Sequence, residues 1–281
     1  MELARSINKA RAAVRSLPKP VGFVPTMGAL HAGHRSLVER ARVECASVIA
    51  SIFVNPLQFG PNDDFLRYPR SFASDSEQLE ALGVQLLFAP PAEHLYPPGF
   101  ATTVDVGAIA SRYEGALRPG HFRGVATVVL KLLDALEPDV LYMGQKDAQQ
   151  TAVIRRMLVD LNVPCTLVVA PTVREPDGLA LSSRNVYLDE AQRRAAPSLY
   201  RALRSVASAI DAGATDRERV LAEARRELEP PLREAYLDVV DAVTFEPLDP
   251  LHAPAVVIGS GWLGTTRIID NVTVEKVLCP V

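Results

Sequence analysis

Apolar runs rich in valine and isoleucine alternate with stretches of helical periodicity through the first part of the chain. The apolar runs lie at 21–25, 48–54, 84–89, 140–143 and 165–169, and the helical stretches at 37–45, 72–82, 122–136 and 148–161. Continuously apolar strands separated by helices are typical of a parallel sheet that helices cover on both faces. We therefore predict a doubly wound, Rossmann-like α/β sheet, whose ligands bind beyond the carboxyl ends of its strands.

The pattern changes after residue 171. Helical stretches at 190–212 and 216–228 precede short strands at 236–240, 255–260 and 265–269. Helices followed by strands indicate a smaller α+β domain. We place the Rossmann-like domain at residues 1–171 and the α+β C-terminal domain at residues 172–281, and we expect the smaller domain to cover the ligand site. Residues 1–15 have the spacing of an amphipathic helix.

The composition argues against several classes of protein. A net charge of −3 over 281 residues gives no general surface for polyanions such as nucleic acids. No apolar run approaches the roughly 20 residues that span a bilayer, and the charged N-terminal stretch is unlike a signal peptide. Cys45, Cys165 and Cys279 are far apart, which favours a reducing compartment without disulfides. We expect a cytoplasmic protein that binds neither nucleic acid nor membranes.

Residues 25–34 read Pro-Thr-Met-Gly-Ala-Leu-His-Ala-Gly-His and join a predicted strand to a predicted helix. Such a turn offers free backbone N–H groups and the positive end of a helix dipole, which suit a polyphosphate. Gly28 and Gly33 let a ligand approach the backbone closely. His31 and His34 are three residues apart, so one helical turn places both rings on one side. A metal-binding pair or two surface histidines is the alternative, but the cysteines form no cluster that supports a metal site.

Two further segments follow predicted strands at the same sheet edge. Gly144-Gln145-Lys146-Asp147 opens a helix, and Lys146 can act there as a point charge for a phosphate. An ordinary helix cap at a solvated turn is the alternative. Gln58 and Gln150 carry amides suited to a hydroxyl or a carboxylate, although either side chain can equally lie on the surface.

Residues 174–185 join the two predicted domains. Pro176-Asp177-Gly178 is a strong turn signal, and Ser182-Ser183-Arg184 offers two hydroxyls and a guanidinium as an anion clamp. A polar helix cap is the alternative for the two serines. The basic loop at 118–124 either lines the site or has a structural role.

These segments together resemble the pantothenate synthetases, or pantoate–β-alanine ligases, of the His-x-Gly-His nucleotidyltransferase superfamily. The resemblance is collinear from Val21 to Asn271. It is carried by Pro-Thr-Met-Gly-x-Leu-His-x-Gly-His, Ser-Ile-Phe-Val-Asn-Pro-x-Gln-Phe, Tyr-Pro-Arg, Arg-Pro-Gly-His-Phe-Arg-Gly-Val, Gly-x-Lys-Asp-x-Gln-Gln, Asp-Gly-Leu-Ala-Leu-Ser-Ser-Arg-Asn and Arg-Ile-Ile-Asp-Asn. One departure is Gln145, where many members carry Glu.

The resemblance implies that pantoate is activated by ATP to pantoyl-adenylate, with release of pyrophosphate, and that β-alanine then displaces AMP. It implies Mg²⁺ between the phosphates, with Asp75 as a candidate ligand, and a homodimer. It implies that His34 is the acid/base residue and that Gln58 and Gln150 hold pantoate. The residues that it assigns to catalysis are His31, His34, Lys146, Ser182, Ser183 and Arg184. The remaining residues that it places around ATP are Met27, Gly28, Ala29, Leu30, Ala32, Gly33, Gly144, Gln145, Asp147, Val173 and Leu181.

Two other functions stay open at this point. A related nucleotidyltransferase that joins a nucleotide to a phosphate ester would use the same turn without β-alanine. A catalytically inactive relic would bind nucleotide or RNA, although the chain lacks a basic, aromatic stripe for RNA. Release of AMP that depends on β-alanine, and exchange of pyrophosphate into ATP that depends on pantoate, distinguish these possibilities.

Overall fold

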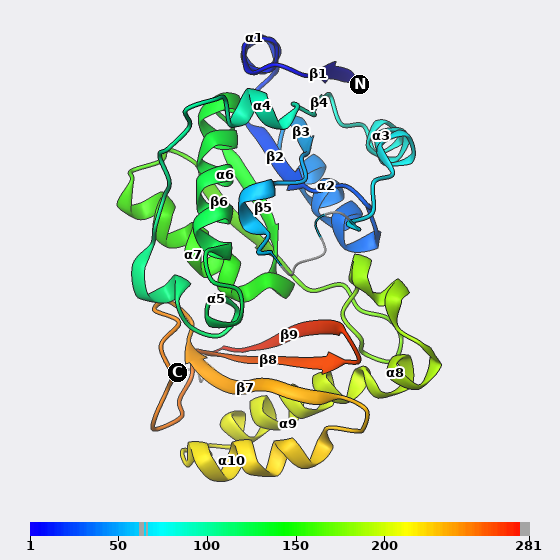
Figure 1. Cartoon of the computed structure of the whole chain (residues 1–281). Coiled ribbons are helices and arrows are strands. Elements are labelled where there is room, and N and C mark those ends of the chain that lie inside the picture. Colours follow the sequence, from blue (N-terminus) through cyan, green and yellow to red (C-terminus); the bar gives the residue numbers. More distant parts are fainter. Residues whose placement is uncertain (62–64, 66, 276–281) are drawn as a thin grey trace. The chain divides into compact units, whose positions relative to one another are not determined.

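The computed structural model describes residues 1–61, 65 and 67–275, so Cys279 lies outside the described residues. The chain forms two compact units (Figure 1). The first contains residues 1–144 and 149–171, and the second contains residues 145–148 together with the chain from Thr172 onward. The sequence predicted a division after residue 171, but it did not predict that residues 145–148 group with the second unit.

The first unit is built on a parallel sheet with the strand order β1-β4-β3-β2-β5-β6. Its strands are β1 (Glu2–Ala4), β2 (Val21–Thr26), β3 (Ser47–Ile52), β4 (Leu86–Phe88), β5 (Val140–Gly144) and β6 (Thr166–Ala170). This confirms the predicted doubly wound class. Strand β1 differs from the prediction, since the spacing of residues 1–15 predicts an amphipathic helix over their whole length. Pairing with β4, a tertiary contact, is what makes Glu2–Ala4 extended.

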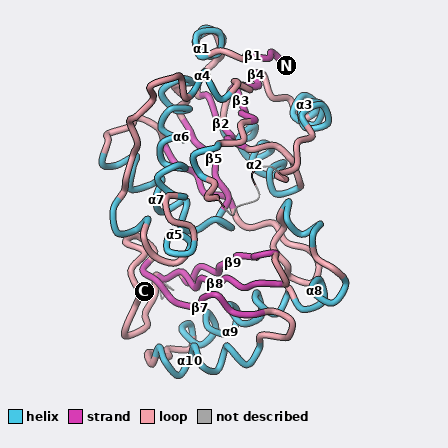
Figure 2. The backbone as a smooth tube through the Cα atoms, in the orientation of Figure 1, coloured by secondary structure: helices cyan, strands magenta, loops and turns pink. Residues whose placement is uncertain are grey.

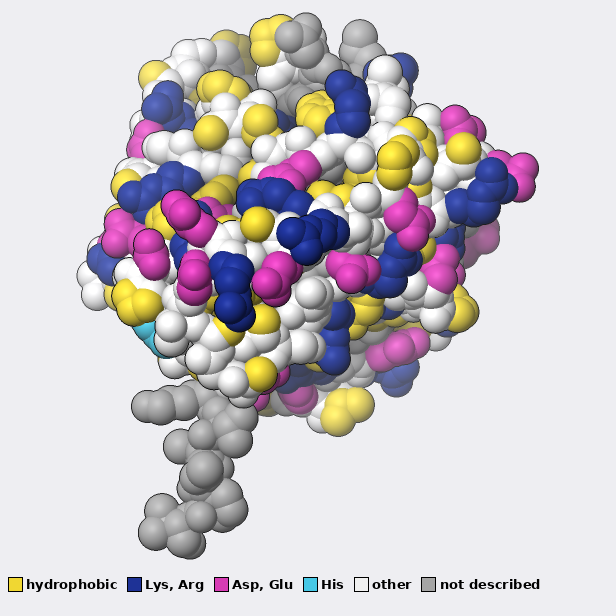
Figure 3. All heavy atoms as spheres, turned by 90° about the horizontal axis from the view of Figure 1, so that it is seen from below, with side chains coloured by type: hydrophobic (Ala, Val, Ile, Leu, Met, Phe, Trp, Pro, Cys, Tyr) yellow, Lys and Arg dark blue, Asp and Glu magenta, His cyan; other side chains and the backbone are white. Residues whose placement is uncertain are grey.

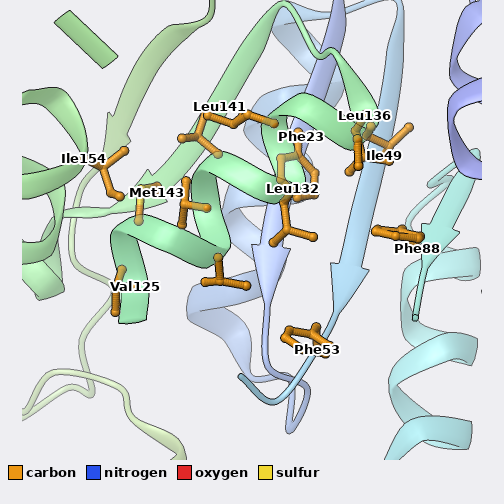
Figure 4. Packing of buried hydrophobic residues seen from close by; sticks show 14 of the residues in the cluster. Phe23, Ile49, Phe53, Phe88, Val125, Leu132, Leu136, Leu141, Met143 and Ile154 are labelled. Atoms are coloured by element: carbon orange, nitrogen blue, oxygen red, sulfur yellow. The ribbon is translucent and has the colours of Figure 1, made fainter. Parts of the chain in front are cut away.

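Helices cover both faces of this sheet, because neighbouring strand residues point to opposite sides. Phe23 packs with helices α1 (Ile7–Arg15), α6 (His121–Leu136) and α7 (Ala148–Asp160), whereas Val24 packs with α2 (Ala32–Glu44) and α3 (Phe72–Ala81). Figure 4 shows Leu132 and Leu136 of α6 packed against Phe23 and Ile49.

The strand order reverses between β2 and β5. Strands β3 and β4 follow on one side of β2, whereas β5 and β6 lie on its other side. β2 and β5 run parallel, with Phe23 opposite Leu141, so Thr26 and Gly144 end at the same edge of the sheet. Ligands of open α/β sheets bind at such a reversal, and the histidine turn follows Thr26 directly.

The second unit places helices on one side of an antiparallel sheet, as Figure 2 shows. Its elements are α8 (Glu190–Ala195), α9 (Pro197–Asp211), α10 (Arg217–Ala224), β7 (Arg233–Asp241), β8 (Ala255–Leu263) and β9 (Thr266–Val274), with the sheet order β7-β8-β9. The predicted helix at 190–212 is two helices that meet at Ala196, because Pro197 starts a new helix. The α+β composition is as predicted.

The surface carries charges of both signs. On the face drawn in Figure 3, basic and acidic side chains are interspersed. In the second unit, Arg201 pairs with Glu229 and Arg225 with Glu234. This mixture matches the small net charge of −3. Among the described residues, no helix is both long enough and apolar enough to cross a bilayer.

Candidate active site

The turn between β2 and α2 has an unusual backbone. Gly28 has a φ of 85° and Ala29 a φ of 52°, both in the left-handed region. A Cβ on Gly28 would lie 3.0 Å from Oδ2 of Asp75, so this position needs glycine for its conformation and for its close packing. The turn ends at His31, which is the N-cap of α2.

The two histidine rings of the turn lie together, with centroids 4.1 Å apart and planes inclined by 39°. Nδ1 of His31 accepts the backbone N–H of Gly33 at 3.1 Å, and Nδ1 of His34 accepts that of His31 over a longer 3.4 Å. A ring nitrogen that accepts a hydrogen bond carries no proton, so each neutral ring is protonated at Nε2. Each ring can therefore donate from its Nε2–H group.

The expectation of free backbone N–H groups in this turn is wrong for most of its length. Side chains already accept the N–H groups of Gly28, Ala29, Leu30, His31 and Gly33. The dipole of α2 and the two imidazoles, rather than these five amides, are therefore what the turn would offer an anion.

Asp75 accepts two of those backbone N–H groups. It lies in the first turn of α3, and only 1% of its surface is exposed. Its Oδ2 accepts from the backbone N–H of Ala29 and the hydroxyl of Ser71, both at 2.9 Å, and its Oδ1 accepts from the N–H of Leu30 at 2.9 Å. The carboxylate thus ties α3 to the histidine turn, a role that the sequence did not predict. Metal binding by Asp75 stays a prediction.

Gln58 is oriented by buried neighbours. It ends a short 3₁₀ helix, η1 (Pro56–Gln58), for which Asn55 is the N-cap. Nδ2 of Asn55 donates to Oε1 of Gln58 at 3.1 Å, while Nε2 of Gln58 donates to Sδ of Met27 at 3.2 Å. Oδ1 of Asn55 in turn accepts the hydroxyl of Tyr96 at 2.8 Å. The amide of Gln58 therefore has one defined orientation.

The basic loop at 118–124 holds the backbone of the same residue. Nδ1 of His121 lies 2.8 Å from the carbonyl oxygen of Gln58, and Nη2 of Arg118 donates to that oxygen at 3.3 Å. Nη1 of Arg118 lies 3.1 Å from Nε2 of His121. Because a guanidinium can only donate, Nε2 of His121 is the acceptor and Nδ1 carries the proton. The loop thus has a structural role beside the candidate substrate residue.

The two adjacent glutamines of α7 have different surroundings. Gln149 is buried, accepts the backbone N–H of Glu114 at 3.1 Å, and donates to the carbonyl oxygens of Ile109 and Arg112, both at 2.8 Å. Gln150 is half-buried. The fold therefore uses the amide of Gln149, and of the pair Gln150 is the better candidate for substrate.

Lys146 belongs to the second unit, in a short 3₁₀ helix, η3 (Gln145–Asp147). Its ammonium lies 3.9 Å from Oδ1 of Asp147, and 21% of its side chain is exposed. Nδ2 of Asn271 in β9 donates to the carbonyl oxygens of Gln145 and Lys146 at 2.8 and 2.9 Å. The sequence predicted Lys146 as a cation at this turn, but it did not predict that Asn271 holds the turn.

The segment before α8 also lies in the second unit. The predicted turn is present, with Gly178 at a φ of 95°. The N–H of Leu181 donates to the carbonyl of Val173 at 3.0 Å, and Ser182 caps a 3₁₀ helix, η4 (Ser183–Tyr187), by accepting the N–H of Arg184 at 3.2 Å. Ser182 therefore acts as a helix cap, which is the alternative to an anion clamp that the sequence left open. Its hydroxyl proton is not used by that bond.

The candidate residues thus form two groups. Met27–His34, Gln58, Asp75, Gly144 and Gln150 belong to the first unit, and Gln145–Asp147, Val173 and Leu181–Arg184 to the second. Within the described part of the chain, no three histidine, cysteine or acidic side chains gather as a metal site.

Comparison with known proteins agrees with this geometry. The model of the pantoate-beta-alanine ligase family matches residues 2–273. The chain belongs to this family. Among its relatives are a pantothenate synthetase of Chloroflexus aurantiacus, 54% identical over 91% of this chain and 92% of that protein, and pantothenate synthetase 1 of Bradyrhizobium diazoefficiens, 51% identical over 96% and 95%.

Solved structures of family members have the same fold. Pantothenate synthetase from Thermus thermophilus matches with a TM-score of 0.92 and 48% identity, over 98% of this chain and all of that one. A ligase from Francisella tularensis, crystallised with beta-gamma ATP and beta-alanine, matches with a TM-score of 0.79 and 36% identity over 97% of both chains.

Proposed function

We propose that this chain is an AMP-forming ligase that condenses pantoate with β-alanine, using ATP and passing through pantoyl-adenylate. The observation that carries the proposal is the pair His31 and His34 at the start of α2, where Nδ1 of each ring accepts a backbone N–H, from Gly33 and from His31 respectively, so that each neutral ring carries its proton on Nε2. They lie where β2 meets a reversal in strand order, which is the ligand edge of such a sheet. Membership of the pantoate-beta-alanine ligase family supports pantoate and β-alanine as the substrates.

In the first step, an oxygen of the pantoate carboxylate forms a bond to the α-phosphorus of ATP, and the bond from that phosphorus to the pyrophosphate oxygen breaks. A carboxylate is already nucleophilic, so no serine or cysteine nucleophile is needed. The barrier comes from bringing two anions together and from charge on the transferring phosphorus. We assign donors to this charge: His31, His34, Lys146, Ser182, Ser183 and Arg184.

In the second step, the amine of β-alanine forms a bond to the acyl carbon, and the bond from that carbon to the AMP oxygen breaks. The attacking amine is deprotonated, and it loses one further proton as the amide forms. His34 is our candidate for the acid/base group, because an imidazole exchanges protons near neutral pH.

We assign pantoate to Gln58 and Gln150. The sulfur of Met27 is a weak acceptor for Nε2 of Gln58, so a hydroxyl or carboxylate oxygen can replace it readily. Gln58 also serves the β-alanine site in this assignment. Met27, Gly144, Asp147, Val173 and Leu181 shape the ATP pocket.

Mg²⁺ fits this site as a partner of the phosphates. Mg²⁺ keeps several waters and is commonly bound through substrate phosphates with one or two carboxylates. Asp75 remains our candidate carboxylate. On the family resemblance we also propose a cytoplasmic homodimer. Sedimentation of the purified protein tests the dimer, and fractionation of cells tests the location.

The test is exchange of labelled pyrophosphate into ATP. We expect exchange to require pantoate and Mg²⁺, and we expect AMP release to require β-alanine as well. Pantoate-dependent exchange that β-alanine does not convert into AMP release would indicate a different nucleotidyltransferase. Tight ATP binding without any exchange would indicate a relic.

A further inference from the structure

Two adjacent polar residues of β9, Asp270 and Asn271, are buried and have no role in the chemistry above. Only 6% of Asp270 and 3% of Asn271 is exposed. Burying a carboxylate and an amide is unfavourable unless both are fully hydrogen-bonded. Their partners therefore indicate what they do.

Asn271 holds the turn that carries Lys146. Its Nδ2 donates to the carbonyl oxygens of Gln145 and Lys146, and its Oδ1 accepts Nε2 of Gln145 at 2.9 Å. The orientation of the amide is unambiguous, because two carbonyl oxygens can only accept. One side chain thus makes three hydrogen bonds to a turn of three residues, Gln145–Asp147.

Asp270 holds the segment that leads to Ser182. Its oxygens accept Nη1 and Nη2 of Arg174 at 2.6 and 2.9 Å. Arg174 also donates to the carbonyl oxygens of Gly178 and Asn271 at 3.0 and 3.2 Å, and its guanidinium stacks 3.7 Å above the ring of Tyr200. Burial raises the pKa of the Asp270 carboxyl, and the Arg174 guanidinium opposes that rise.

Arg174 is close to the clamp in the chain and in space. It pairs with Ala180 in an antiparallel bridge, and the neighbouring Val173 accepts the N–H of Leu181. Ser182 follows directly. The position of the clamp residues 182–184 is therefore set by the arginine that Asp270 holds.

We infer that Asp270 and Asn271 are positioning residues for ATP: two neighbouring residues in the middle of β9 hold both the Lys146 turn and the Ser182–Arg184 segment in place. The inference rests on the proposed function only in assigning those two segments to ATP. Neither residue needs to touch substrate. Losing either one displaces phosphate donors, so adenylation suffers while pantoate binding and the attack of β-alanine on preformed pantoyl-adenylate do not.

The first test compares Asn271→Ala with Ser260→Ala. Ser260 is a buried residue of the same sheet that also donates to a backbone carbonyl, that of Ile268 at 3.1 Å, but this bond stays within the sheet. For Asn271→Ala we expect kcat/KM for ATP in pyrophosphate exchange to fall by about ten- to a hundredfold. Hydrogen exchange at residues 145–148 should become faster. Ser260→Ala should change neither quantity.

Asn271→Asp separates hydrogen bonding from packing. Aspartate has nearly the volume of asparagine, but a carboxylate cannot donate to the carbonyls of Gln145 and Lys146. We expect a loss at least as large as in Asn271→Ala. Should these variants fold poorly, Asn271→Ser keeps one hydroxyl donor, and an intermediate loss is expected.

The second test compares Asp270→Asn with Asp238→Asn. Asp238 forms a similar half-buried pair with Arg217, at 2.6 Å, elsewhere in the same unit. We expect Asp270→Asn to raise KM for ATP and to speed hydrogen exchange at residues 178–184, and Asp238→Asn to do neither.

Three results overturn the inference. One is a matched loss in the variant and its control, another is an equal loss in both half-reactions, and the third is unchanged amide exchange at the held segments. A wild-type chain without pantoate-dependent exchange would instead contradict the proposed function. The amide-exchange comparison would still decide whether Asp270 and Asn271 hold these segments.

Discussion

Gln149 and Gln150 are neighbours in sequence, yet the side chain of Gln149 stabilises the fold and that of Gln150 is assigned to pantoate. All the hydrogen bonds of the Gln149 amide are to backbone groups of the same unit. Gln149→Ala removes a partner of one buried and two half-buried backbone groups, so we expect a loss of about 1–3 kcal/mol in the free energy of unfolding. Gln150→Ala should weaken pantoate binding and leave the melting temperature nearly unchanged.

Thermal melting and calorimetric titration with pantoate measure both effects. A stable Gln149→Ala protein, or a Gln150→Ala protein with normal pantoate affinity, would contradict the assignment. ATP affinity serves as the internal control, since neither change is expected to alter it.

His34 contributes a donor and the candidate acid/base group, and its ring also braces the turn through the N–H of His31. We expect His34→Ala to slow pantoyl-adenylate formation by about two to four orders of magnitude. The fold should persist, because the long 3.4 Å bond that is lost is weak. His252→Ala, at an exposed histidine of the second unit, is the control. Single-turnover adenylation near the wild-type rate would refute the role of His34.

At the scale of elements, α3 and the histidine turn are joined by one carboxylate. In Asp75→Asn, an NH₂ group replaces one of the two carboxylate oxygens that accept the N–H groups of Ala29 and Leu30. An NH₂ group cannot accept, so at least one of these N–H groups loses its partner. We expect slower adenylation even at saturating Mg²⁺, because the imidazoles move with the turn. Magnesium titration of the variant makes the measurement. Full recovery of the rate at high Mg²⁺ would assign Asp75 to the metal alone and would contradict its role in holding the turn.

The elements themselves could be predicted well from the sequence, because buried parallel strands and amphipathic helices are determined locally. Strand β1 was missed because its extended form depends on pairing with β4. Residue type alone let the sequence nominate His34 and Lys146 for the candidate site, and their roles there stay predictions. Asn55, Asp75 and Asn271 were not assigned these roles, because each acts through contacts with backbone that is distant in sequence or through neighbours whose orientation only the fold defines.

At the scale of the whole molecule, the proposed reaction needs donors from both groups of residues at a single nucleotide. We therefore expect ATP with Mg²⁺ to order the segment around Ser182 and to slow hydrogen exchange at residues 181–185. ADP-ribose, which lacks a triphosphate, is the control ligand. Unchanged exchange at saturating ATP would argue against the clamp.

The grouping of residues 145–148 with the second unit has a consequence for dividing this protein. A gene fragment that starts at Thr172 would encode all three strands of the small sheet. It would lack Gln145 and Lys146, whose carbonyl oxygens accept the amide of Asn271. The complementary fragment would contain Gln145 and Lys146 but lack Asn271. Each fragment contains only one side of this contact, so we expect a C-terminal fragment that starts at Thr172 to be less stable than one joined to a peptide of residues 145–148.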